Sequence, residues 1–190
     1  MIPHPVDIWT IPLTQPHPVL LSADEAARAA RFHAAKDREH WSRSHSALRT
    51  ILASYAGVGP LDLQFAIGPH GKPGLPEHAG IEFNLSHARD YAIIAVTRDV
   101  PVGVDIQDIR PKTDISALLR RLGEPDHEGT LLELYGRWTR REARSKAAGG
   151  ALFDSPLPDI HALDINAPEG YAAAVALRGF EPRPTYLSSL

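Results

Sequence analysis

The middle of the chain reads Gly103-Val104-Asp105-Ile106-Gln107-Asp108, and it opens a second series of structural elements. Alternating apolar and polar residues predict a strand over Val102–Ile106, with its apolar side chains in the core and Asp105 and Gln107 together on the other face. A carboxylate and an amide oxygen side by side suit Mg²⁺, which prefers oxygen ligands. A strand whose polar residues simply face water explains the same pattern equally well.

The elements expected after this strand repeat the order of those before it. For the first half we expect a strand, two helices and three strands, at Val6–Leu13, Ser22–Phe32, Asp37–Ala56, Leu63–Ile67, Ile81–Leu85 and Tyr91–Thr97. For the second half, two helices and a hairpin follow, at Asp114–Leu122, Glu128–Ala148, Ile160–Ile165 and Tyr171–Leu177. The order predicts a structural duplication, followed by a surface tail from Glu181.

Length and composition restrict the classes of protein. The 190 residues suffice for one domain or for two small halves on a shared core. The absence of cysteine excludes disulfides, thiolate nucleophiles and cysteine-based metal sites, and it fits a reducing cytoplasm. The net charge of -3 gives no overall attraction to nucleic acid or anionic membrane. The apolar runs are too short to span a bilayer, and the N-terminus does not resemble a secretory signal.

A second polar segment, Phe83-Asn84-Leu85-Ser86-His87, ends an apolar strand. Its hydroxyl and imidazole are groups that bind phosphate. Ser86 and His87 make a poor catalytic pair, because neighbouring strand residues point to opposite faces and a nucleophile needs its base within hydrogen-bond reach. Taken alone, the segment is more typical of a polar turn with a solvated histidine.

A third segment, Trp138–Lys146, lies on the longer helix of the second half. Glu142 and Lys146 are four residues apart and share a helix face. The segment is also the most basic stretch of the chain, so it suits phosphate or an acidic partner; its arginines are Arg137, Arg140, Arg141 and Arg144. In isolation, a solvent-exposed ion pair on an amphipathic helix is the simpler explanation.

The segments become specific when they are taken together and in order. The series is Gly71-Lys72-Pro73, Phe83-Asn84-Leu85-Ser86-His87, Gly103-Val104-Asp105-Ile106, and Trp138-Thr139-Arg140-Arg141-Glu142-Ala143 with Lys146. This series resembles the motifs of the two-domain 4'-phosphopantetheinyl transferases of the surfactin-synthetase-activating type, over residues 20 to 150. The resemblance implies an α+β fold, a pseudo-dimer of two similar halves, residues 1–100 and 101–190, with the active site in the cleft between them. It also implies a cytoplasmic monomer.

The resemblance also implies roles for individual residues. Asp105 and Glu142 match the metal-ligand carboxylates, and Lys146 matches the lysine that contacts the pyrophosphate of coenzyme A. The other expected coenzyme contacts are Lys72, Ser86, His87 and, for the 3'-phosphate, Arg28 and Lys36. Gln107 stands where many members have Glu; its oxygen can still coordinate the metal, but the site has one negative charge fewer.

The implied reaction transfers the 4'-phosphopantetheine arm of coenzyme A to a serine of an apo acyl or peptidyl carrier protein, with release of adenosine 3',5'-bisphosphate. Mg²⁺, or alternatively Mn²⁺, neutralises the pyrophosphate. Lys146 and His87 stabilise its oxygens. Glu142 removes the serine proton, directly or through a metal-bound water, and the sequence leaves both routes open. The carrier protein belongs to fatty-acid, polyketide or non-ribosomal peptide synthesis.

Three other functions remain open from the sequence. Gln107 and the short C-terminal half are compatible with a non-catalytic relative that binds coenzyme A or a carrier protein. The same carboxylates suit a metal-dependent phosphohydrolase. A nucleic-acid-binding module is the least favoured, because the basic stretch is local and lacks interleaved aromatic residues.

Overall fold

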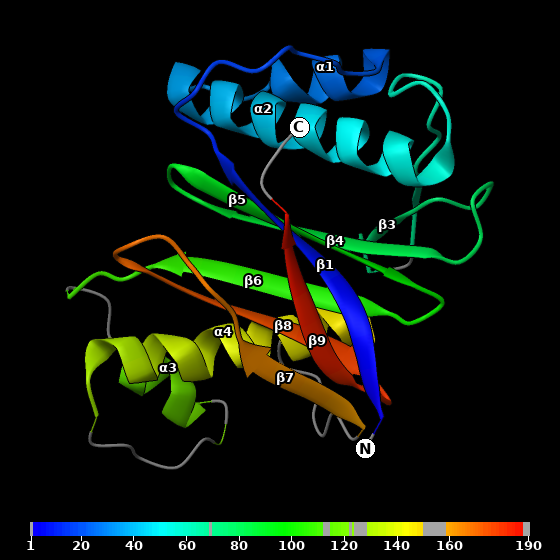
Figure 1. Cartoon of the computed structure of the whole chain (residues 1–190). Helices are drawn as coiled ribbons and strands as arrows, with labels where there is room; N and C mark the ends of the chain where they lie inside the picture. The colour runs from blue at the N-terminus through cyan, green and yellow to red at the C-terminus, as the bar shows by residue number, and fades with distance from the viewer. Residues whose placement is uncertain are drawn as a thin grey trace.

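Two β-sheets pack against each other in the middle of the molecule, and helices cover the outer side of each (Figure 1). The computed structural model describes residues 2–68, 70–111, 115–121, 123, 129–149 and 159–187. Helices α1 (Ala23–Ala29) and α2 (Ala35–Ala56) lie on one side, and α3 (Ile115–Arg121) and α4 (Leu131–Ala148) lie on the other. The expected α+β class is confirmed.

The first sheet has four strands and the second has three. The first runs in the order β4 (Ile81–Ala88), β5 (Tyr91–Arg98), β1 (Pro3–Pro12) and β9 (Glu181–Leu187). The second runs in the order β6 (Val102–Asp108), β8 (Tyr171–Arg178) and β7 (Ile160–Asp164). Short strands β2 (Ala66–Ile67) and β3 (Pro73–Gly74) pair separately. Along the chain, a strand, two helices and an antiparallel hairpin therefore occur twice.

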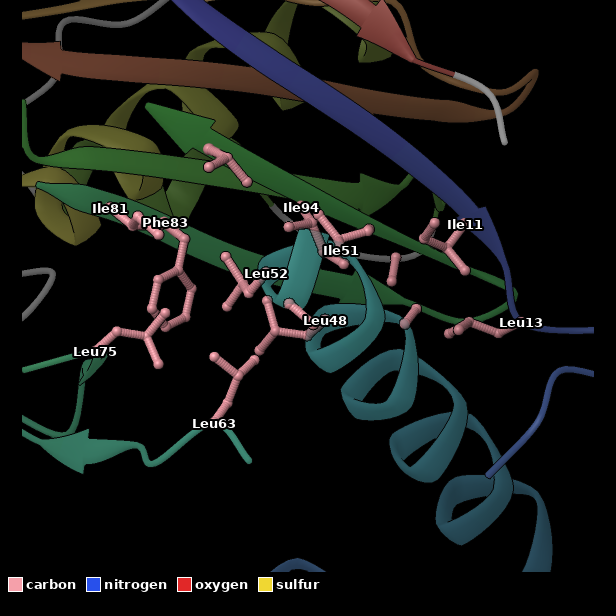
Figure 2. Packing of buried hydrophobic residues seen from close by; sticks show 14 residues of the cluster. Ile11, Leu13, Leu48, Ile51, Leu52, Leu63, Leu75, Ile81, Phe83 and Ile94 are labelled. Carbon is pink, nitrogen blue, oxygen red and sulfur yellow. The ribbon is translucent and has the colours of Figure 1, made fainter. Parts of the chain in front are cut away.

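The first core lies between α2 and the outer face of the first sheet (Figure 2). Leu48, Ile51 and Leu52 recur at helical spacing and are almost completely buried. They meet Phe83 and Ile94 of the sheet, as Figure 2 shows. Burying a side chain of this size contributes about 2 kcal/mol, so α2 is fixed to the sheet mainly by this face.

The second core lies between the two sheets. Val6, Ile8 and Ile93 of the first sheet pack with residues of the second sheet that include Val104 and Ile106. Strand β5 contributes to both cores, because Ile93 and Ile94 point to opposite faces. Its unbroken apolar run therefore reflects burial on both sides rather than a half-exposed strand.

Helix α4 lies unusually close to β6. A Cβ atom on Gly103 would be 2.0 Å from the carbonyl oxygen of Ala143 and 2.4 Å from the amide nitrogen of Ala147. Only glycine fits at this point of the strand, which explains a residue that otherwise weakens strands. The close approach brings the C-terminal half of α4 against the strand that carries Asp105.

The edges of the two sheets are joined by side chains of β4. The Asn84 side-chain oxygen accepts a hydrogen bond from the backbone N–H of Val104 at 2.9 Å. The Ser86 hydroxyl accepts one from the backbone N–H of Ile106 at 3.4 Å. These contacts hold the residues on either side of Asp105, so the position of that carboxylate is fixed from the first sheet.

Some sequence predictions were wrong in detail. The segment from Glu181 is not a surface tail but strand β9, parallel to β1, in register from Pro3 opposite Glu181 to Trp9 opposite Leu187. Pro182 and Pro184 are tolerated because β9 is an edge strand, where a missing N–H faces no partner.

Several boundaries also differ from those expected. The first helix ends at Ala29 rather than Phe32, and the strand expected over Leu63–Ile67 is reduced to Ala66–Ile67. Helix α4 begins at Leu131 because the Thr130 side chain and Glu133 form a capping box. The expected helix ends at Asp114, Leu122 and Glu128 lie outside the described residues. Within the described part of the chain, no helix has the length and apolarity needed to cross a membrane.

Candidate active site

Asp105 lies where β4, β6 and α4 meet, and it is 2% exposed. Its Oδ1 atom accepts hydrogen bonds from the Ser86 hydroxyl at 2.9 Å and from the Lys146 ammonium at 2.6 Å. Its Oδ2 atom accepts one from the Gln107 amide nitrogen at 3.1 Å. A buried carboxylate requires such partners, because burial of an unpaired charge is costly. Ser86, Asp105, Gln107 and Lys146 therefore form one connected group, which we call the Asp105 group.

Lys146 reaches the Asp105 group from the C-terminal part of α4. Its ammonium donates to Asp105, to the Ser86 hydroxyl at 3.0 Å and to the Val104 carbonyl oxygen at 3.2 Å. An ammonium has three N–H donors, and these three acceptors use all of them. Helix spacing alone favours a surface ion pair between Glu142 and Lys146. That interpretation is wrong for Lys146, because its ion pair is with the buried Asp105.

Glu142 lies about one turn before Lys146 on the same helix and is half-buried. Burial raises its pKa above the usual 4.5, and the negative charge of Asp105 raises the pKa further, while Lys146 and Arg141 oppose this. The repulsion shows that the two carboxylates share one electrostatic environment. A divalent cation between them would relieve that repulsion, so the donor set fits Mg²⁺.

Gln107 lies on the same face of β6 as Asp105, as its spacing predicts. Its amide nitrogen, and not its oxygen, points at Asp105. In this arrangement it supports the Asp105 carboxylate as a hydrogen-bond donor. Among the described residues, no group of three or more His, Cys, Asp or Glu side chains is placed to hold a metal. A cation at Asp105 would therefore depend on few protein ligands.

His87 points away from Ser86 and is exposed, which agrees with the prediction that neighbouring strand residues face opposite ways. The surrounding protein desolvates its imidazolium and lowers the pKa of His87 below 6.5. The positive charges of His45, Lys146 and His40 lower this pKa further. His87 is thus placed between the Asp105 group and α2.

His40 and His45 of α2 were not predicted as site residues. His45 stacks on Trp41 with ring centroids 3.9 Å apart, and its Nδ1 lies 3.8 Å from a Glu25 carboxylate oxygen. The spacing of Trp41 and His45, four residues apart on a helix, is the only sequence signal for this pair. Their approach to His87 depends on how α2 packs on the sheet, which no local pattern reveals.

Lys72 lies in the loop between β2 and β3, and its ammonium donates to the Val102 carbonyl oxygen at 2.8 Å. Burial lowers the pKa of Lys72 below 10.5. The side chain contributes to the wall of a cavity of about 550 Å³ between residues 66–83 and the C-terminal end of α4. This cavity and the Asp105 group are both bordered by β4 and α4.

Arg28 and Lys36 make contacts around α2. The Arg28 guanidinium carbon lies 5.6 Å from the centre of the Trp41 ring, and Lys36 forms an ion pair of 3.0 Å with Asp90. Lys36 therefore fixes the start of α2 to the turn that follows His87. Neither residue belongs to the Asp105 group, whose hydrogen bonds come from β4, β6 and α4.

Sequence comparison shows which known proteins the chain resembles. The model of the family described as "4'-phosphopantetheinyl transferase, N-terminal" matches residues 16–99. The chain is 31% identical to the 4'-phosphopantetheinyl transferase HetI of Nostoc sp. strain PCC 7120, over 95% of this chain and 91% of that protein. It is 34% identical to a putative 4'-phosphopantetheinyl transferase of Synechocystis sp. strain PCC 6803, over 84% and 72%.

A more distant relative is Sfp of Bacillus subtilis strain 168, which is 23% identical over 87% of this chain and 79% of that protein. The similarity to HetI covers nearly all of both chains. The chain therefore belongs to the 4'-phosphopantetheinyl transferase family, whose members are enzymes that use coenzyme A as a substrate.

Proposed function

We propose that this enzyme transfers the 4'-phosphopantetheine arm of coenzyme A to a serine of an apo acyl or peptidyl carrier protein, with Asp105 and Glu142 holding Mg²⁺ or Mn²⁺. Adenosine 3',5'-bisphosphate is the second product. The observation that carries the proposal is the buried Asp105 carboxylate, which Ser86 and Lys146 contact where α4, the helix that also carries Glu142, packs against β6. Two carboxylates that repel each other next to basic side chains are suited to a cation and a phosphate ester.

The metal supplies charge neutralisation and orientation of the diphosphate when it is bound. Asp105 is held in position by Ser86 and Lys146, and a cation at its Oδ1 atom would take the place of one of these donors. Gln107 would coordinate only after its amide turns, because its nitrogen now faces Asp105. The two carboxylates are therefore the principal protein ligands.

The remaining residues act on the coenzyme and on the proton. Lys146 and His87 stabilise the diphosphate oxygens, and Ser86, between Asp105 and Lys146, helps to place them. Glu142 accepts the proton of the attacking serine, directly or through a water molecule.

The coenzyme is proposed to extend from this centre in two directions. Lys72 borders a cavity beside the Asp105 group, while Arg28 and Lys36 offer positive charge near the start of α2 for the 3'-phosphate. Lys36 must leave Asp90 to do so. Both groups of contacts belong to the same proposed coenzyme site.

The two-half organisation is part of this proposal. Residues 1–100 and 101–190 would form the halves of a pseudo-dimer, with the active site in the cleft between them. The repeated order of elements supports this division, as do two sheets that each have their own long helix. Strand β9 belongs to the second half of the chain but pairs with β1 in the first sheet, so this sheet contains strands from both halves. We propose a monomer that acts in the cytoplasm.

Mass spectrometry of an apo-carrier protein tests the proposal. After incubation with enzyme, coenzyme A and Mg²⁺, the carrier protein should gain one phosphopantetheine arm. A bound but unmodified carrier protein would instead indicate a non-catalytic relative, and coenzyme A breakdown without a carrier protein would indicate a phosphohydrolase.

A further inference from the structure

Lys146 occupies Oδ1 of Asp105, one of the two carboxylate oxygens that could bind a cation. Its ammonium lies 2.6 Å from Oδ1, and the side chain of Asp105 is 2% exposed against 29% for that of Lys146. The Ser86 hydroxyl donates to the same oxygen at 2.9 Å. A divalent cation that binds Oδ1 must therefore displace at least one of these two donors.

The contact is built into the packing and does not arise from a free surface side chain. Gly103 allows the backbone of α4 to approach β6 at Ala143 and Ala147, on either side of Lys146. The Val104 carbonyl oxygen and the Ser86 hydroxyl then complete the ammonium's hydrogen bonds. With three donors and three protein acceptors, Lys146 has no N–H left for a phosphate oxygen.

The net charge of the site also disfavours a divalent cation in the free enzyme. Asp105 and Glu142 contribute two negative charges, and the positive charges of Lys146 and Arg141 offset them, so little net negative charge remains for a divalent cation. Gln107 adds none. A positive charge within a few ångströms opposes a cation strongly, even at the effective dielectric constant of a protein surface. The diphosphate of coenzyme A would add the missing negative charge and would also offer new acceptors to the displaced ammonium.

We propose that Lys146 and the divalent cation compete for Asp105, so that the cation enters only together with the coenzyme's diphosphate. In the free enzyme, Lys146 balances the negative charge of Asp105. When the coenzyme binds, the Lys146 ammonium moves from Asp105 to the diphosphate. This inference rests on the proposed function, because it assumes that Asp105 is a metal ligand. It adds an order of binding and a role for Lys146 before the coenzyme is present.

Electron paramagnetic resonance of Mn²⁺ tests the proposal without turnover. Free Mn²⁺ is titrated with the purified full chain at neutral pH, alone, with coenzyme A, and with adenosine 3',5'-bisphosphate, which has no diphosphate. Protein-free mixtures correct for binding to the nucleotides. We expect weak binding to the enzyme alone, binding at least about tenfold tighter with coenzyme A, and little gain from the bisphosphate.

Variants separate the role of Lys146 from a general effect of charge. Lys146→Met should bind Mn²⁺ without coenzyme at least about tenfold more tightly than the unchanged enzyme, because the competing charge is gone. Lys146→Gln provides the same test if the Met variant does not fold. Lys146→Arg keeps the charge and should stay weak. Arg98→Met removes an exposed guanidinium that donates to the Tyr55 carbonyl oxygen, and it should leave coenzyme-free binding unchanged.

Two results would overturn the inference and leave the metal site standing. One is equal Mn²⁺ affinity with and without coenzyme A; the other is no tightening in Lys146→Met and Lys146→Gln. In both cases Asp105→Asn would still weaken Mn²⁺ binding. If Mn²⁺ does not bind even with coenzyme A, or if Asp105→Asn has no effect, the proposed metal site itself is wrong.

Discussion

Lys146 and Asp105 are 41 residues apart in the chain, yet the Lys146 ammonium lies 2.6 Å from Oδ1 of Asp105. The pair joins α4 to β6 at the point where Gly103 permits their close approach. It also neutralises a buried carboxylate that would otherwise be costly. One ion pair thus serves the packing of the second half and the electrostatics of the candidate active site.

Loss of either carboxylate should stop transfer. We expect Asp105→Asn and Glu142→Gln to lower the rate of carrier-protein modification at least about a hundredfold, because each removes a negative charge from the proposed metal site. Both changes preserve side-chain shape, so circular dichroism and the unfolding midpoint should show a folded chain. Asp164→Asn removes an exposed carboxylate paired with Arg140 and is the matched control. Wild-type rates in either site variant would refute the metal assignment.

A glutamate in place of Gln107 should strengthen metal binding. Gln107→Glu adds a negative charge next to Asp105, whose Oδ2 now accepts from the Gln107 amide. We expect the Mg²⁺ concentration for half-maximal activity to fall several-fold, and Mn²⁺ to bind more tightly. An unchanged metal dependence would show that this position contributes no ligand and supports Asp105 only as a donor.

Gly103 should be intolerant of any side chain. A Cβ atom there would lie 2.0 Å from the Ala143 carbonyl oxygen, so Gly103→Ala must push α4 away from β6. We expect a loss of about 3 kcal/mol in unfolding free energy, measured in urea, together with lower activity. Gly74→Ala is the control for stability, since nothing lies within 4 Å of its added Cβ. Equal stability of both variants would contradict the close packing.

Glu25 should make stability depend on pH in the acid range. Burial alone would raise its pKa, but the His45 imidazole nearby and hydrogen bonds from Arg49 and the Ser22 backbone prevail and lower the pKa from 4.5 to about 2. The charged form therefore stabilises the fold fully above pH 4.5, and this contribution, about 2 kcal/mol when solvent screening is allowed for, is lost as the pH falls toward 2.

Glu25→Gln should accordingly destabilise the protein by about 2 kcal/mol at pH 7, and its difference from the unchanged chain should shrink below pH 4.5. Asp24→Asn, at an exposed position of the same helix turn, is the control for the helix-dipole effect. A difference that stays constant from pH 7 to pH 3 would contradict this assignment.

Local patterns predicted most of the fold. The apolar face of α2, the β7–β8 hairpin and the face shared by Asp105 and Gln107 all follow from the sequence pattern, and the structure confirms them. Strand β9 escaped prediction because its prolines mark a loop, whereas an edge strand tolerates them. Its partner β1 lies at the other end of the chain, where no short-range signal can reveal it.

The candidate site was predictable as a set of residues but not as a network. The order of the motifs identified Asp105, Glu142 and Lys146 as site residues. The four-residue spacing of Glu142 and Lys146, however, suggested an ion pair between these two side chains. The contact of Lys146 with Asp105 depends on long-range packing of α4. His40 and His45 were missed for the same reason, since only the docking of α2 brings them near His87.

The most direct measurement is the intact mass of an apo-carrier protein after incubation with this enzyme, coenzyme A and Mg²⁺. A small panel should include carrier proteins of fatty-acid, polyketide and non-ribosomal peptide synthesis, each with a matched variant whose acceptor serine is changed to alanine. The account predicts the mass gain of one phosphopantetheine arm on at least one carrier protein, none on its alanine variant, and none with Asp105→Asn enzyme. An unmodified panel, or equal modification by the Asp105→Asn enzyme, would contradict it.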